Sequence, residues 1–130
     1  MKMHSNADDI AKRIKARAAR LPGALRSGIR TLLSRIDRAQ VENLAGSKEA
    51  APGSYPVPNR TGDLMRGHGF KRTGAASGMV FNTSGHAFAV HEGRGSSAPY
   101  GRRPFLEDAA KSVDETMVIE NELRSQVFTP

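Results

Sequence analysis

Histidines and a neighbouring carboxylate are the residues of this sequence best suited to chemistry, because imidazole and carboxylate groups bind metals and move protons. His86, His91 and Glu92 lie close together in the chain, whereas His68 stands alone and His4 lies near the N-terminus. The five-residue step between His86 and His91 matches no compact zinc signature, and no second cluster completes it. The pattern favours a polar edge on a half-buried segment over a metal site.

Nucleophilic catalysis is the other chemistry to consider. Ser84, His86 and Glu92 supply the residue types of a hydrolytic triad, but nothing around Ser84 resembles a nucleophile elbow. Four glycines match neither a phosphate-binding loop nor a dinucleotide fingerprint: Gly62, Gly67, Gly69 and Gly74. The chain has no cysteine, which excludes disulfides and thiolate zinc sites. We therefore predict a protein that is not an enzyme and has no catalytic residue, metal site or cofactor.

Charge is separated along the 130 residues, which have a net charge of +7 and a pI near 10.4. Eight basic residues occur without an intervening acid: Lys12, Arg13, Lys15, Arg17, Arg20, Arg26, Arg30 and Arg35. Six acidic residues gather near the C-terminus: Glu107, Asp108, Asp114, Glu115, Glu120 and Glu122. The two groups could neutralise each other within one chain or between neighbouring subunits, and nucleic acid is the other candidate partner.

The basic stretch lacks the features of a DNA reader. Its charges lie around much of the helix circumference, no aromatic residue is interleaved for base stacking, and no helix-turn-helix or zinc finger follows. A solvated helix that faces a protein partner is therefore favoured. Nonspecific contact with phosphates, which needs only lysine and arginine, stays open.

Apolar residues recur at steps of three and four from Ile10 to Leu44, which predicts an amphipathic helix. Pro22 interrupts this pattern. We expect a short helix to about Arg20 and a longer one from Pro22 to about Ala45, with a single kinked helix as the alternative.

Shorter elements follow. Residues 46–60 are rich in Pro, Gly and Ser, which predicts a flexible arm whose removal would leave the folded monomer intact. His68–Thr73 and Ser77–Thr83 alternate partly and predict an antiparallel hairpin. The apolar run Ala87–Val90 is compatible with either a strand or a short helix.

A Gly/Ser/Arg loop at 93–103 leads to a final helix that opens at Pro104. The layout predicts a single α+β domain over residues 1–130, with a small antiparallel β region between the N-terminal and C-terminal helices. No secretory signal or membrane-length apolar stretch is found in the sequence, so we expect a protein made in the cytoplasm and without membrane contact.

Three segments carry the most specific pattern: PVPNRTGDLMR at 56–66, AFAVHEG at 87–93 and RPFLEDA at 103–109. Each has a structural interpretation. Thr61 would cap a short helix anchored by Leu64, and Gly93 would adopt a positive φ. Pro104 would fix the entry of the last helix, while Phe105 with Leu106 would fill the core.

In this order the segments resemble a family of small neck and tail-completion proteins of tailed bacteriophages, related to the minor tail protein Z type. The resemblance spans roughly residues 10–125, and it departs from the family at His86, where an aromatic residue is usual. The residues that carry it are Thr61, Gly62, Leu64, Ala89, Val90, Glu92, Gly93, Arg103, Pro104, Phe105, Leu106 and Ala109.

The resemblance implies a non-enzymatic virion structural protein that forms a ring with copies of itself at the head–tail junction. Its other partners would be connector proteins and a tail-tube or terminator protein, and its basic side chains would face an acidic subunit or channel DNA. The expected contact residues are Pro56, Val57, Pro58, Arg60, Arg94, Tyr100 and Arg102. A tail terminator and a small basic nucleic-acid-binding protein are the alternatives.

Overall fold

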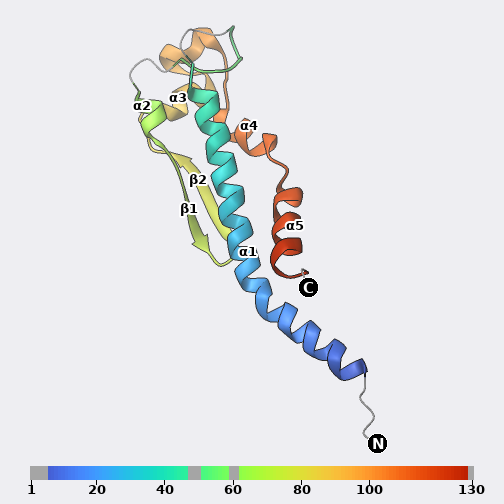
Figure 1. Ribbon diagram of the computed structural model, residues 1–130. Helices are drawn as coiled ribbons and strands as arrows, with labels where there is room; N and C mark the ends of the chain where they lie inside the picture. The colour runs from blue at the N-terminus through green and yellow to red at the C-terminus, as the bar shows by residue number, and fades with distance from the viewer. Residues whose placement is uncertain (1–5, 47–50, 59–61, 129–130) are drawn as a thin grey trace, which may run out of the picture.

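One long helix forms the spine of the molecule (Figure 1). The structure, a computed structural model, describes residues 6–46, 51–58 and 62–128. Helix α1 runs from Asn6 to Leu44 without interruption and contains Pro22. Its axis bends in the N-terminal part (Figure 1), as expected where a proline removes a backbone hydrogen bond and crowds the preceding turn. The prediction of two helices separated at Pro22 is therefore wrong, and the alternative of one kinked helix is correct.

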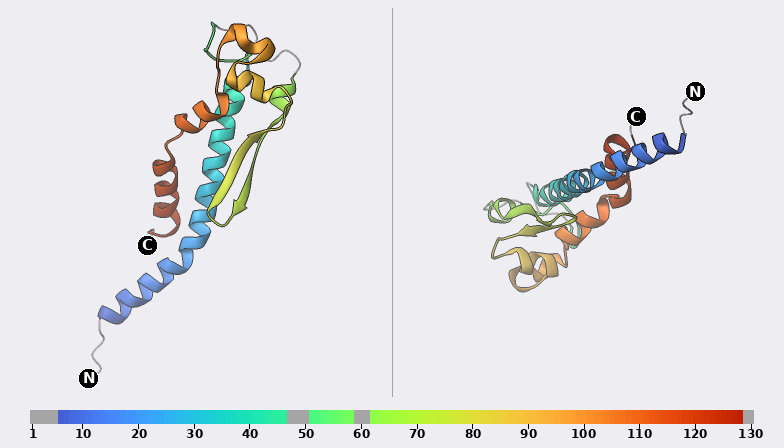
Figure 2. Two further views of the ribbon diagram at one scale, coloured as in Figure 1. Left: turned by 180° about the vertical axis from the view of Figure 1, so that it is seen from behind. Right: turned by 90° about the horizontal axis from the view of Figure 1, so that it is seen from below.

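The β region is a two-stranded antiparallel hairpin, as predicted. Strand β1 (His68–Gly74) pairs with β2 (Ser77–Asn82), and Phe70 lies opposite Val80. An isolated hairpin is marginally stable in water. Here it packs along α1, on the side away from the C-terminal helices (Figures 1 and 2).

Buried polar side chains of α1 hold the hairpin in place. His68 Nδ1 lies 2.8 Å from Asp37 Oδ2, and the Gln40 amide donates to the carbonyl oxygen of Phe81 at 3.3 Å. Gln40 also donates to Asp37 at 3.0 Å and accepts from the Asn82 amide at 3.0 Å. Because Asp37 and Gln40 are buried, these bonds satisfy groups that would otherwise destabilise the fold.

Short helices gather around the C-terminal end of α1. They are α2 (Asp63–Arg66), α3 (Ala87–Glu92) and the 3₁₀ helix η1 (Gly95–Tyr100). The apolar run Ala87–Val90 is thus helical. The 93–103 segment is more regular than the loop we expected, since η1 occupies most of it.

The final helix is divided into α4 (Phe105–Ser112) and α5 (Glu115–Gln126), where we expected one continuous helix. Val113 adopts an extended backbone, and the carboxylate of Asp114 accepts a 3.1 Å hydrogen bond from the Met117 N–H, which caps α5. The whole is an α+β structure, in agreement with the predicted class. Within the described residues, no helix combines the length and apolar character needed to cross a membrane.

Besides the hairpin, two further sets of contacts cover α1. At its C-terminal end, Leu44, Val57, Val90 and Phe105 form the main hydrophobic cluster. Further toward the N-terminus, α5 lies alongside α1 (Figure 1). There a Cβ atom on Gly28 would lie 2.9 Å from Cδ1 of Ile119, so the absence of a side chain permits the close approach of the two helices.

Candidate assembly surface

The three segments behind the family resemblance meet at one end of the molecule. We call the residues that join them the motif cluster: Val57, Leu64, Val90 and Phe105. Phe105 is fully buried, while Val57 and Val90 are 3% and 7% exposed. Leu64 of α2 is the partly buried member of the cluster; Leu106 of α4 packs against the cluster, and Ala109 is buried in α4. Segments far apart in sequence therefore share one core.

Glycines shape the edges of this cluster. Gly93 ends α3 with φ 66°, the positive φ that we predicted, and a Cβ there would lie 2.7 Å from the backbone nitrogen of Arg102. Gly62, with φ 80°, occupies the N-cap position of α2 that we expected Thr61 to fill. Thr61 itself lies outside the described residues. Pro104 precedes α4 as its N-cap, so its fixed φ of −73° sets the entry of that helix.

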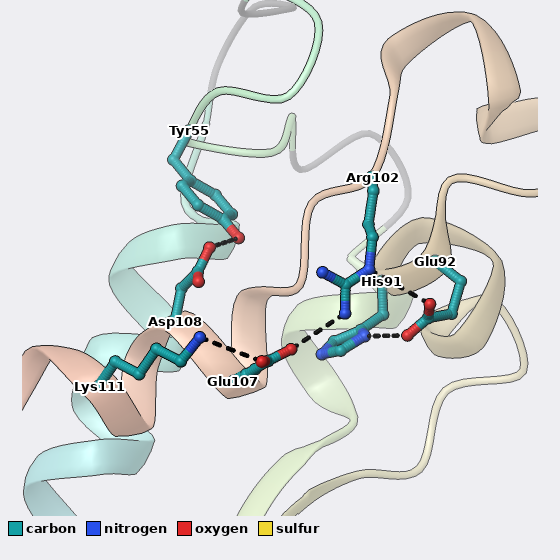
Figure 3. A network of polar contacts seen from close by, with 7 residues as sticks. All are labelled: Tyr55, His91, Glu92, Arg102, Glu107, Asp108 and Lys111. Carbon is teal, nitrogen blue, oxygen red and sulfur yellow. Dashed lines mark hydrogen bonds and ion pairs between the residues drawn. The ribbon is translucent and has the colours of Figure 1, made fainter.

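A network of hydrogen bonds and ion pairs connects the loop after η1 to α3 and α4 (Figure 3). The Arg102 guanidinium donates to Glu92 at 3.3 Å and to Glu107 at 3.0 Å. Lys111 donates to Glu107 at 3.1 Å, and His91 Nδ1 lies 2.8 Å from Glu92 Oε1. Hydrogen bonds from His91 and Arg102 lower the pKa of Glu92, and those from Lys111 and Arg102 lower the pKa of Glu107. The network joins three elements that are separated in sequence.

The Pro-rich segment is anchored by several hydrogen bonds, among them those of Tyr55 and Val57. The Tyr55 hydroxyl donates a 2.7 Å hydrogen bond to Asp108 of α4. The pKa of Tyr55 is raised mainly by burial of the phenol and, to a smaller extent, by this hydrogen bond. The Val57 N–H donates to the carbonyl oxygen of Asn43 at 2.7 Å, and its side chain belongs to the motif cluster. Our prediction of a free arm is therefore wrong for this part of the segment.

The predicted contact residues of that segment differ in their exposure to solvent. Pro56 is exposed and Pro58 is partly buried beside Gly46, with which it forms a bridge. Val57 is corrected from a contact residue to a core residue, because its side chain is not accessible to a partner. Arg60 lies outside the described residues.

In the loop, Arg94 is exposed and its guanidinium lies 5.8 Å from the ring centre of Phe88, itself 66% exposed. Tyr100 is partly buried under the guanidinium of Arg103, at 5.4 Å, and Arg103 is 2% exposed. Arg102 is exposed but engaged in the charged network. Arg94 and Phe88 are therefore both accessible to a partner.

Of the residues considered for catalysis, Ser84 and His86 line one pocket with Asp63 and Arg66, and Glu92 is not among the residues that line it. His86 Nε2 lies 3.9 Å from Asp63 Oδ2, while Glu92 pairs with His91 and Arg102. The Ser84 hydroxyl accepts a 3.2 Å hydrogen bond from the backbone N–H of His86. Across the described ranges, no three His, Asp or Glu side chains are placed to hold a metal ion.

A groove lies between α1 and the hairpin that we did not predict from the sequence. We call it the basic groove; it is lined by Gly23, Arg26, Ser27, Arg30, Leu33, Phe70 and Arg72. The helix supplies two arginines and β1 supplies Arg72 with Phe70, which is 37% exposed. The two-residue step from Phe70 to Arg72 places them on one strand face, which was the available signal. The pairing of this face with α1 depends on the fold.

In comparisons with known proteins, no protein-family model matches the chain, and no curated protein or solved structure matches it.

Proposed function

We propose that this chain is a non-enzymatic structural protein of a tailed-phage virion, acting at the head–tail junction as a neck or tail-completion subunit of a ring. The observation that carries the proposal is the convergence of the three family-like segments on the motif cluster. Segments around Leu64, Val90 and Phe105 resemble the family separately in sequence, and in space they pack against one another. This packing gives the three segments a shared structural role, which supports the proposal.

The surface is consistent with a subunit whose role is to present contacts. Arg94 and Phe88 are exposed beside η1, and the N-terminal part of α1 is exposed along its length. Large exposed apolar side chains in soluble proteins mark interaction surfaces when they cluster. Copies of the chain and neighbouring connector, tail-tube or terminator proteins are the partners that the proposal implies.

The test is electron microscopy of lysates from the phage or prophage with this gene deleted. Filled heads beside separate tails would establish a joining role, and tails of irregular excess length would establish a terminator instead. Complementation with the wild-type gene should restore joined particles, which controls for effects on neighbouring genes. Normal, infectious particles from the deletion would refute the structural role.

Nucleic-acid binding is the second candidate, favoured by the basic groove. Arg26, Arg30 and Arg72 line one groove with an exposed aromatic ring, a combination suited to phosphates and to base stacking. Binding to DNA would weaken steeply with salt, and each lost phosphate contact would reduce the slope of log affinity against log salt by about 0.9. Replacing the three arginines by alanine should then reduce the slope more than replacing Lys12, Arg13 and Lys15. Equal effects of the two triple variants would exclude the groove as the binding site.

A further inference from the structure

The N-terminal part of α1 presents an apolar stripe to solvent. We call residues 6–21 the N-terminal projection; Figures 1 and 2 show it extending past the rest of the molecule. Ile10, Ile14 and Leu21 are 54%, 61% and 40% exposed. At 3.6 residues per turn, their spacing places them within about 40° of one another around the helix. Ala7, Ala11 and Ala18 widen the same stripe.

The stripe continues into a face that the chain itself covers. Gly28, seven residues after Leu21, is buried against Ile119 of α5. Ser27 donates to Glu122 Oε1 at 3.0 Å in the same contact. Helix α5 ends at Gln126, and Phe128 beyond it reaches Arg17, whose guanidinium lies 6.0 Å from the ring centre. The chain's own α5 therefore covers one part of this face of α1 and leaves Ile10 and Ile14 exposed.

Charge indicates what could cover the exposed part. The projection has five basic residues against two acidic ones, Asp8 and Asp9, so pairing two projections would bring like charges together. The α4–α5 region has the opposite balance, with six acidic residues against two basic ones. Its outer surface also exposes an apolar side chain, since Met117 of α5 is 50% exposed.

We propose that the N-terminal projection of one copy docks on the outer face of α5 of a second copy. Ile10 and Ile14 would contact Met117, the exposed apolar side chain of α5. The basic side chains of the projection would lie near the acidic residues that flank Met117, which are Asp114, Glu115 and Glu120. Helix α5 of the second copy would then cover the N-terminal projection, and the chain's own α5 covers α1 around Gly28.

This contact joins two different surfaces of the same chain. Such a head-to-tail interface leaves a free projection and a free α5 at the two ends of a pair, so further copies add until a ring closes or a filament forms. The inference deepens the proposed function, on which it rests for its biological setting, by naming the contact between ring subunits.

Engineered cysteines can test the contact directly, because the chain has none of its own. Ile14→Cys and Met117→Cys proteins are purified separately, mixed, and treated with a short bifunctional thiol reagent. We expect a cross-linked pair that contains one copy of each variant, with a yield that falls several-fold as salt is raised. Thr73→Cys, at an exposed hairpin position, replaces Ile14→Cys in the control mixture. Circular dichroism of each variant verifies folding.

A charge exchange provides the second measurement. Glu115→Lys with Glu120→Lys on the Met117→Cys copy should reduce the cross-link several-fold. Arg13→Glu with Lys15→Glu on the Ile14→Cys copy should restore it. Restoration would not occur if the acidic residues acted only on folding of their own copy.

Three results would overturn the proposal. Cross-linking of Ile14→Cys with itself, and not with Met117→Cys, would show that two projections pair symmetrically. An equal yield with Thr73→Cys would show random collision. No cross-link at the highest soluble concentration would show that α5 does not receive the projection. Because these experiments use purified protein, a specific cross-link beside normal particles from the gene deletion would refute the phage role and leave the contact standing.

Discussion

The hydroxyl of Tyr55 donates a 2.7 Å hydrogen bond to Oδ2 of Asp108, which lies 53 residues further along the chain (Figure 3). This bond ties the Pro-rich segment to the first turn of α4, close to the buried ring of Phe105. The partly buried phenol and the carboxylate together make the position sensitive to both substitution and pH. The hydrogen bond between Tyr55 and Asp108 makes the Pro-rich segment part of the folded structure at this end of the molecule.

Ionisation of Tyr55 should destabilise the fold at alkaline pH. Burial and the bond to Asp108 raise the pKa of Tyr55 above its ordinary value of 10.0. The stabilisation is therefore present below pH 10 and is lost as the pH rises toward the folded-state pKa. Ultraviolet titration should detect one of the two tyrosines ionising late. Tyr55→Phe should abolish the late step and Tyr100→Phe should retain it; the reverse result would contradict the assignment.

Removal of residues 48–58 should prevent cooperative folding, contrary to the expectation from sequence. The deletion takes away Tyr55 and the buried Val57. Val57→Ala alone should lower the free energy of unfolding by about 2 kcal/mol, because it leaves a cavity beside Phe105. Denaturant unfolding measures both changes, with Pro52→Ala, an exposed position of the same segment, as the matched control. A deletion variant with an unchanged unfolding midpoint would show that the segment is dispensable.

Phe105→Ala should be among the most destabilising single substitutions. The ring is fully buried and its edge-to-face contact with His91 has a centroid distance of 5.4 Å. Deleting such a side chain costs about 3–5 kcal/mol in other cores. Phe88→Ala removes the same group at a position 66% exposed and should change stability by less than about 0.5 kcal/mol. A loss below about 1 kcal/mol for Phe105→Ala would mean that the ring does not support the core.

Gly93 and Gly95 allow backbone strain to be separated from crowding. Both have a positive φ, of 66° and 60°, so alanine at either position incurs a strain of about 1–2 kcal/mol. A Cβ at Gly93 would also meet backbone atoms of Gly101 and Arg102 at 2.7 Å, whereas none lies within 4 Å at Gly95. Thermal unfolding should show a larger loss for Gly93→Ala than for Gly95→Ala. Equal losses would indicate that α3 and the loop do not approach closely in solution.

Acid should weaken the charged network around Arg102. Hydrogen bonds lower the folded-state pKa values of Glu92 and Glu107 below the ordinary value of 4.5. Their stabilisation is therefore present above pH 4.5 and is lost as the pH falls through the lowered values. Unfolding measured across this range should show a smaller acid-induced loss in the double variant Glu92→Gln with Glu107→Gln. Glu115→Gln, outside the network, should behave as the wild type does.

The sequence by itself determined the fold class and the local elements. The step of three and four residues predicted the helical character of Asn6–Leu44, and the partial alternation with a glycine-rich turn predicted the hairpin. The buried position of Phe105 and the positive φ of Gly93 also followed from local pattern. The helix, the hairpin and the φ of Gly93 depend on local backbone preferences, whereas the burial of Phe105 also requires Leu44 and Val57, which lie far away in the chain.

Tertiary structure decided which of those surfaces are covered. Ile10 and Leu44 belong to the same apolar pattern, yet one is 54% exposed and the other 1%, because only the second has distant segments packed on it. The burial of Val57 and the meeting of Phe70 with Arg26 likewise depend on segments far away in sequence. Periodicity reports that a face is apolar, but the free energy of burial is gained only where the fold brings a second surface to it. For Ile10, we infer that another copy of the chain supplies that surface.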